Sequence, residues 1–203
     1  MNVRSAGFGT IITLVFTLFL FGCSHKVDER LIGSEECNPP CVLGIQPGVT
    51  ETTKTVQLLE DLETNSVGKL TILDSGIIRW RASNTNYYFY PDGNLIKEIS
   101  LSPEATTLQD IITLFGEPAY LHLGKIRDGG FFVSVFYPEK GLCFVVGGDK
   151  AGFLIEPDMP VVKADFIEPT NIATMVKSLY GKEAVEDALA EIQSWHGYGK
   201  LFP

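Results

Sequence analysis

The sequence predicts an α+β protein in which an antiparallel sheet carries helices that are segregated from its strands. Three observations lead to this fold class. Short apolar runs follow one another between turn residues such as Asp128-Gly129-Gly130, and short connections favour antiparallel neighbours. Apolar residues at helical spacing occur before and after these runs. A helix opening followed by a proline-containing turn occurs twice, which indicates an internal repeat.

The first αβ repeat is predicted over residues 41–101. Its helix is expected between Glu51 and Leu62, where apolar residues recur at helical spacing, and Thr50 is a suitable N-cap. The phrase Phe89-Tyr90-Pro91-Asp92-Gly93 then predicts a strand end and a tight turn.

The second αβ repeat is predicted over residues 102–156. Its helix runs from Leu108 to Phe115 and stops at Gly116-Glu117-Pro118, because glycine followed by proline is a typical helix stop. The phrase Phe136-Tyr137-Pro138-Glu139-Lys140-Gly141 matches the turn of the first repeat. The two matches in the same order predict a duplicated helix-plus-hairpin unit.

The remaining elements complete one globular unit over residues 41–203. Residues 157–203 are expected to form a last strand and C-terminal helices packed on the sheet, with a helix over 172–180 and another whose apolar face extends to Trp195. Strands are expected over 69–73, 76–82, 86–90, 94–100, 119–126, 130–137, 141–147, 151–156 and 161–167.

The first 22 residues have the layout of a secretory signal: Arg4 precedes an apolar run from Phe8 to Phe21 that is too short for a comfortable membrane span. The sequence Leu20-Phe21-Gly22-Cys23 resembles a bacterial lipobox. That resemblance implies that Cys23 is acylated, with palmitate as one of its lipids, and begins the mature protein. A simple cleaved signal and an uncleaved anchor are the alternatives. We therefore expect a lipid-anchored protein outside the cytoplasm, on the inner or the outer membrane, with residues 23–40 as a tether.

The acidic composition limits the classes of partner. The formal net charge is −9, and removal of residues 1–22, whose single charge is Arg4, changes it to −10 (−9 − 1). Nucleic-acid binding and polybasic membrane binding both need clustered cations, so neither is expected. The predicted partners are the membrane, through the lipid anchor, and an envelope protein or peptide.

Cysteine usage agrees with an oxidising compartment. Besides Cys23, the chain holds Cys37, Cys41 and Cys143, an odd number that allows one disulfide and leaves one thiol. The short spacing and the Pro-Pro turn between Cys37 and Cys41 favour that pair, with pairing to Cys143 left open. Cys143 lies in an apolar run and is interpreted as a buried thiol.

No motif in the sequence names a reaction or a ligand. Nucleophile-elbow, zinc-protease, phosphate-loop and dinucleotide motifs do not occur, and the three histidines are far apart. We therefore expect no cofactor, no metal and no catalytic residue, and a non-enzymatic binding or scaffolding module. The alternative is an envelope hydrolase with a non-standard carboxylate site near His122.

Aromatic residues are concentrated in two predicted strands that could carry a binding patch. Tyr88 and Tyr90 share one side of a predicted strand, and Phe132 and Phe136 share one side of another. A strand that is apolar on both faces is either covered on both or offers a patch to a partner. These four residues are the candidate binding patch, the alternative being that they belong to covered strands.

The two helix openings also carry a family resemblance. Gly44-Ile45-Gln46-Pro47-Gly48-Val49-Thr50 with Leu58-Leu59, and Thr107 through Pro118, resemble the corresponding phrases of small envelope lipoproteins, including that of the β-barrel assembly machine. The resemblance implies a non-enzymatic αβ module that scaffolds or regulates an assembly. It covers about thirty residues and transfers no binding residue to this chain.

Overall fold

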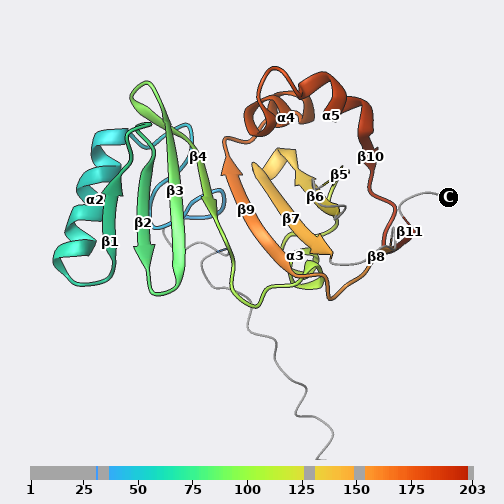
Figure 1. The fold of residues 1–203 in the computed structure, drawn as a ribbon, viewed down its shortest axis with the longest axis horizontal. Helices are drawn as coiled ribbons and strands as arrows, with labels where there is room; N and C mark the ends of the chain where they lie inside the picture. The colour runs from blue at the N-terminus through green and yellow to red at the C-terminus, as the bar shows by residue number, and fades with distance from the viewer. Residues whose placement is uncertain (1–30, 32–36, 126–130, 149–153, 201–203) are drawn as a thin grey trace, which may run out of the picture.

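The computed structural model describes Leu31 and residues 37–125, 131–148 and 154–200. Their main feature is a nine-stranded antiparallel sheet with the strand order β1-β2-β3-β4-β9-β7-β6-β5-β10, accompanied by four α-helices (Figure 1). The α+β class and the antiparallel sheet predicted from the sequence are confirmed.

The chain builds the sheet in two halves that meet where β4 pairs with β9. The first half comprises α2 (Thr52–Thr64), β1 (Lys69–Ile72), β2 (Ile78–Ala82), β3 (Thr85–Asp92) and β4 (Leu95–Leu101). The second comprises α3 (Leu108–Phe115), β5 (Tyr120–Lys125), β6 (Phe131–Tyr137), the 3-10 turn η3 (Pro138–Lys140), β7 (Leu142–Gly148), β8 (Leu154–Ile155) and β9 (Val161–Ile167). The chain continues with α4 (Ile172–Tyr180), α5 (Val185–Glu191), β10 (Ile192–Ser194) and β11 (Gly199–Lys200), which pairs with β8.

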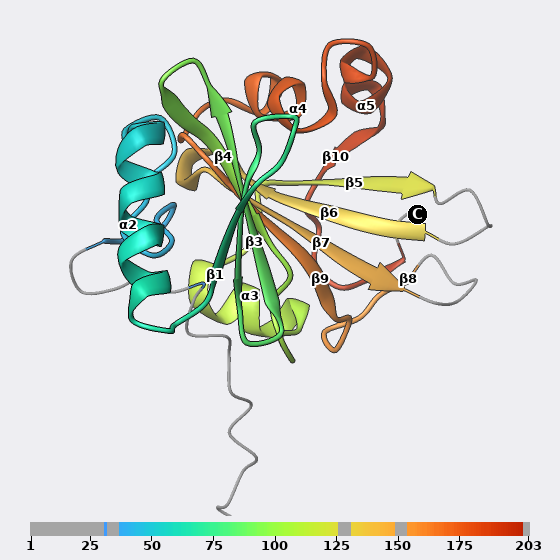
Figure 2. The same cartoon turned by 60° about the vertical axis from the view of Figure 1, so that its left-hand side comes forward.

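Helices cover the two faces of the sheet unequally. The main core lies between one face and the helices α2 and α3, and its largest fully buried side chains include Trp80, Phe89, Phe144 and Phe166. A second core lies on the opposite face, where α4 and α5 pack Met175, Val176 and Ala188 against strands of the second half. Figure 2 shows α2 and α3 on one side of the sheet and α4 and α5 on the other.

Local sequence explains how α3 and α4 begin. The side chain of Thr107 accepts from the backbone N–H of Asp110, and the Asp110 carboxylate accepts from the N–H of Thr107, which forms a reciprocal capping box. Asn171 caps α4 by accepting from the N–H of Thr174. Thr50 does not cap α2: the helix has Glu51 at its N-cap, and the Thr50 hydroxyl accepts instead from the backbone N–H of Gln46 at 2.8 Å.

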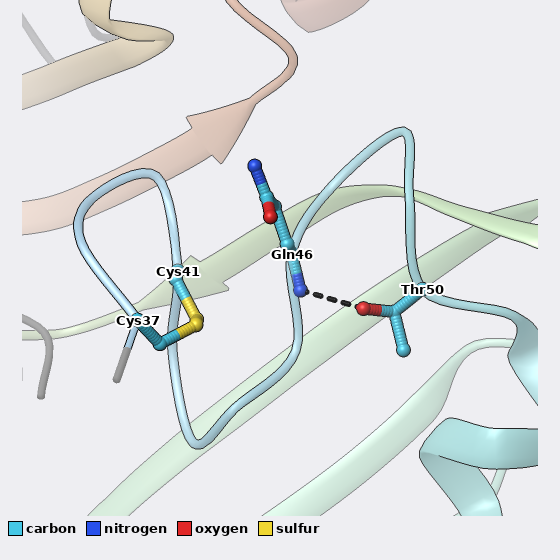
Figure 3. Close-up of a disulfide and its surroundings, with 4 residues drawn as sticks. All are labelled: Cys37, Cys41, Gln46 and Thr50. Atoms are coloured by element: carbon cyan, nitrogen blue, oxygen red, sulfur yellow. Dashed lines mark hydrogen bonds between the residues drawn. A yellow bond between two sulfur atoms is a disulfide. The ribbon is translucent and has the colours of Figure 1, made fainter.

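The N-terminal part of the fold is closed by a disulfide between Cys37 and Cys41, as predicted (Figure 3). The loop that follows is held by the bond between Gln46 and Thr50. Leu31 lies within the segment expected to be a tether, yet its side chain is fully buried in the main core. The folded part therefore includes residues before position 41.

The two turn phrases that suggested the repeat occupy different places in the topology. The first joins β3 to β4, the third and fourth strands after α2, whereas the second joins β6 to β7, the second and third strands after α3. What does occur twice is a helix followed by antiparallel strands.

The chain end differs from the sequence prediction. The last helix, expected to extend to Trp195, ends at Glu191, and Ile192–Ser194 pair with β5 as an edge strand. Pairing with β10 satisfies the backbone N–H and C=O groups on the outer edge of β5. These groups would have no sheet partner if the helix continued. Among the helices the structure describes, none combines the length and the apolar character needed to span a membrane.

Candidate binding surface

The face of β1–β4 that points away from α2 is not covered by any helix in the described part of the chain (Figure 1). We call it the open face. It continues onto β9 and ends where α4 lies across the second half of the sheet. It is formed by Lys69, Arg79, Arg81, Asn86, Tyr88, Tyr90, Glu98, Ser100, Lys163 and Asp165.

The strand register places these residues side by side. Arg79 lies directly opposite Tyr88, Tyr88 opposite Ser100, and Ser100 opposite Asp165. Residues directly opposite one another in antiparallel strands point to the same face and interact. The intervening residues, such as Trp80 and Phe89, point into the main core. The alternation of the strands therefore separates a polar face from the core.

Positive charge collects on the part of the open face formed by β1 and β2. Lys69 and Arg81 are exposed and directly opposite each other, and Arg79 is half-buried two residues along the strand. Within the described residues, no carboxylate lies at ion-pair distance from these three side chains. Like charges directly opposite each other repel and destabilise the strand pair. Among the described residues, no carboxylate offsets this repulsion between Lys69 and Arg81.

A polar cluster lies at the junction of β4 and β9. The single proton of the Ser100 hydroxyl is shared between the carboxylates of Asp165 and, at 3.3 Å, Glu98, and Lys163 forms an ion pair with Asp165 at 2.9 Å. Asp165 is almost completely buried, whereas the Lys163 side chain is partly exposed. Two carboxylates and one ammonium group therefore meet around one hydroxyl.

Burial and mutual repulsion perturb the acids of this cluster. Burial, followed by the nearby Asp165 carboxylate, raises the pKa of Glu98 to about 7. Burial also raises the pKa of Asp165, against the opposing effect of Lys163. Burial lowers the pKa of Lys163, but the charge and hydrogen bond of Asp165, together with the charges of Glu98 and Tyr90, outweigh this effect, so the pKa is raised. Groups whose pKa is shifted by burial and a specific neighbour are candidates for a functional site.

A cavity of about 230 Å³ adjoins the polar cluster at the C-terminal end of α4. Phe132, Val145 and Leu179 supply apolar walls, and Lys163 and Asp165 extend to its rim. The ring of Phe132 lies over Gly124, where any Cβ would overlap the ring. Because glycine has no side chain, position 124 leaves the space that the Phe132 ring occupies.

His122 belongs to a hydrogen-bonded chain beneath α4 and α5. Its Nε2 lies 3.5 Å from the Glu191 carboxylate, and its Nδ1 lies 3.4 Å from the hydroxyl of Tyr180, which in turn contacts the Ser134 hydroxyl at 2.9 Å. Burial lowers the pKa of His122, and Glu191 opposes this effect. His122 is not among the residues that line the cavity, whereas Ser134 and Tyr180 do line it. The arrangement connects α4 and α5 to β5 and β6.

The structure separates the four residues of the predicted patch. Tyr88 and Tyr90 are half-buried on the open face, and Phe132 lines the cavity. Phe136 is fully buried in the second core beneath α4 and α5, so its side chain contributes to no exposed patch. The predicted lipid-attachment residue Cys23 lies outside the described residues.

Sequence reasoning missed the polar members of the site. Ser100 and Asp165 are 65 residues apart and come together only through the pairing of β4 with β9. A signal was present in Val161–Ile167, where Lys163 and Asp165 alternate with apolar residues. Two charged residues on one side of an otherwise apolar strand indicate a polar surface on that side.

Comparison of the chain with known proteins finds no matching family model, no matching curated protein and no matching solved structure.

Proposed function

We propose that this chain is a lipid-anchored protein of the bacterial cell envelope that binds a partner polypeptide on its open face and catalyses no reaction. The observation that carries the binding role is the uncovered half of the sheet. Helices shield both faces of the second half, whereas only one face of β1–β4 carries a helix. An exposed face with tyrosines, and with cations that have no ion-pair partner in the described part of the chain, offers ring area, hydroxyls and charge to a partner.

The reactive side chains near this face favour binding over catalysis. The Cys143 thiol is buried, and burial raises its pKa well above the usual value, so it remains protonated and is a poor nucleophile. Both ring nitrogens of His122 already face Tyr180 and Glu191. A hydrolase built on His122 would need this chain of contacts to open toward a substrate.

The envelope location is supported by sequence features outside the described residues and by the cysteines. The lipobox-like sequence ending at Cys23 supports acylation. The disulfide between Cys37 and Cys41 suits an oxidising compartment. Because one acyl chain anchors a protein only marginally, several chains on the N-terminal cysteine would be needed for stable attachment.

We further propose that the two halves arose from a duplicated helix-plus-strand unit. In its support, α2 precedes four successive antiparallel strands, and α3 precedes β5, β6, β7 and β9 in the same sheet. The last strand of each half pairs with that of the other, in antiparallel orientation. This correspondence is based on topology and replaces the match between the two turn phrases.

Site-specific photo-crosslinking in living cells that express the full chain tests the binding role. A photoreactive phenylalanine analogue at Asn86, on the open face opposite Arg81, is expected to form a specific adduct with a partner protein. The same analogue at Glu60, exposed on α2, is the matched control and is expected to form none. Adducts from Glu60 alone, or from neither position, would contradict the proposal.

Metabolic labelling with radioactive palmitate tests the anchor separately. The natural chain is expected to incorporate the label and a Cys23→Ser variant to lose it. Equal incorporation by the two chains, or none by the natural chain, would reject lipidation at Cys23.

A further inference from the structure

Charge on the open face is ordered along the direction that crosses the strands. Lys69, Arg79 and Arg81 supply the cations on β1 and β2. Tyr88 and Tyr90 follow on β3, and Glu98 follows on β4. The face is therefore positive at its outer edge, aromatic in the middle and anionic next to α4.

The two charged ends differ in how much internal compensation they have. The cations of β1 and β2 have no ion-pair partner among the described residues. At the other end, Lys163 is paired with Asp165, which leaves Glu98 with the Ser100 hydroxyl as its hydrogen-bonding neighbour. The charges of Lys163 and, to a smaller extent, Lys97 also act on Glu98, but Lys163 is paired with Asp165 and Lys97 lines a second cavity of about 270 Å³ together with Glu168. Each end thus has charge that a partner of opposite sign can neutralise.

The distance between the charged ends follows from the strand order. Arg79 on β2 and Glu98 on β4 are separated by two inter-strand spacings of about 4.8 Å, and Glu98 lies two residues along β4 from Ser100, which is in line with Arg79. The lateral offset of about 10 Å and the offset of about 7 Å along the strands therefore give a separation of about 12 Å. An extended chain advances about 3.3 Å per residue. Four residues of an extended peptide therefore cover the distance from one charged end to the other, and residues four apart point to the same side.

We propose that the partner presents an extended peptide segment that crosses the strands of the open face, with an acidic side chain over Arg79 and Arg81 and a basic side chain four residues away, on the same side of the peptide, over Glu98. This inference rests on the proposed binding function and adds the chemistry of the bound segment. The tyrosines of β3 contact the residues between the two charges. Because a peptide can lie in either direction, the separation of the charges matters and their order does not.

An anionic membrane surface suits this face less well. Lipid phosphates would meet Arg79 and Arg81 favourably but would also approach Glu98 and Asp165, which repel them. The exposed large apolar side chains of the described chain are, moreover, not on the open face; Ile72, on β1, lies opposite Ile78 and so faces the other side of the sheet. We therefore assign the face to a polypeptide and treat vesicle binding as an opposing outcome.

The test uses the full chain purified in mild detergent and eight-residue peptides carrying a neutral fluorophore. One peptide has glutamate and lysine four positions apart, so that both side chains lie on one side of an extended chain, and the other has the same composition with these residues adjacent. Fluorescence anisotropy at pH 8.5, above the raised pKa of Glu98, is expected to show binding of the first peptide about fivefold to tenfold tighter than the second. Arg79→Glu and Glu98→Gln are each expected to remove this preference.

Lys54→Glu is the matched control, because it changes the net charge as Arg79→Glu does but lies exposed on α2. It is expected to leave the preference unchanged. Equal binding of both peptides overturns the inference, as does binding to phosphatidylglycerol vesicles without binding to either peptide. Failure of both peptides while Asn86 still crosslinks to a partner overturns the inference and leaves the proposed function in place.

Discussion

The raised pKa of Glu98 predicts that replacing its carboxyl group by an amide stabilises the protein at alkaline pH. Burial and the Asp165 carboxylate raise this pKa from 4.5 to about 7. The folded state therefore holds a proton on Glu98 that the unfolded state releases between pH 4.5 and 7. The stability associated with this group is present below pH 4.5 and is lost as the pH rises through 7. Glu98→Gln cannot ionise and keeps a side chain that can bond to Ser100.

The size of the expected stabilisation follows from the pKa shift of Glu98. A difference of about 2.5 pKa units (7 − 4.5) at about 1.36 kcal/mol per unit corresponds to a penalty of about 3 kcal/mol at pH 8. At pH 5 the folded state is mostly protonated, so the penalty falls below about 1 kcal/mol. The free energy of unfolding of Glu98→Gln is therefore expected to exceed that of the natural chain by about 3 kcal/mol at pH 8 and by much less at pH 5.

Guanidinium unfolding of both chains at pH 5 and pH 8 measures this difference. Glu60→Gln is the control, since its carboxylate is exposed on α2, and it is expected to change stability by less than about 0.5 kcal/mol at either pH. Equal stability of Glu98→Gln and the natural chain at pH 8, or a loss of stability there, would refute the electrostatic reasoning about the polar cluster.

Two further predictions concern the strands of the second half. Gly124→Ala is expected to destabilise the protein by about 1–3 kcal/mol in chemical denaturation, because its methyl group would overlap the Phe132 ring. In a Phe132→Ala background the same change is expected to cost much less, and equal costs in both backgrounds would show that the ring is not the obstacle. In a Cys23→Ser variant, Ellman's reagent is expected to modify Cys143 only after unfolding, because the thiol is buried and protonated. Rapid modification of the folded chain would contradict this burial.

The local elements were predictable because their causes lie within a few residues. The capping box of α3 depends on Thr107 and Asp110, three positions apart. The disulfide depends on two cysteines that are close in sequence. The expected last strand over 161–167 has the bounds of β9, since apolar and β-branched residues mark it directly. The cap of α2 failed because Thr50 has a second possible partner, the N–H of Gln46, which only the folded loop presents.

The candidate site was only partly predictable. Tyr88 and Tyr90 were recognised from the alternation of a single strand, and the structure leaves that side uncovered. The same argument placed Phe136 in the patch, but α4 and α5 bury it. Alternation identifies which residues share a side of a strand, and it does not indicate whether a helix will later cover that side.

The sequence by itself determined most of the helices and strands, favoured the pairing of Cys37 with Cys41, and fixed which side chains share each side of a strand. The tertiary structure decided which of those sides is buried and which is exposed. Pairing of β4 with β9 brought Ser100 to Asp165, and docking of α4 and α5 on the second half left one face of the first half open. The physical reason is range: a turn or a cap is fixed by neighbours in the chain. The meeting of distant strands and the covering of a sheet depend instead on the total apolar surface that the whole chain can bury.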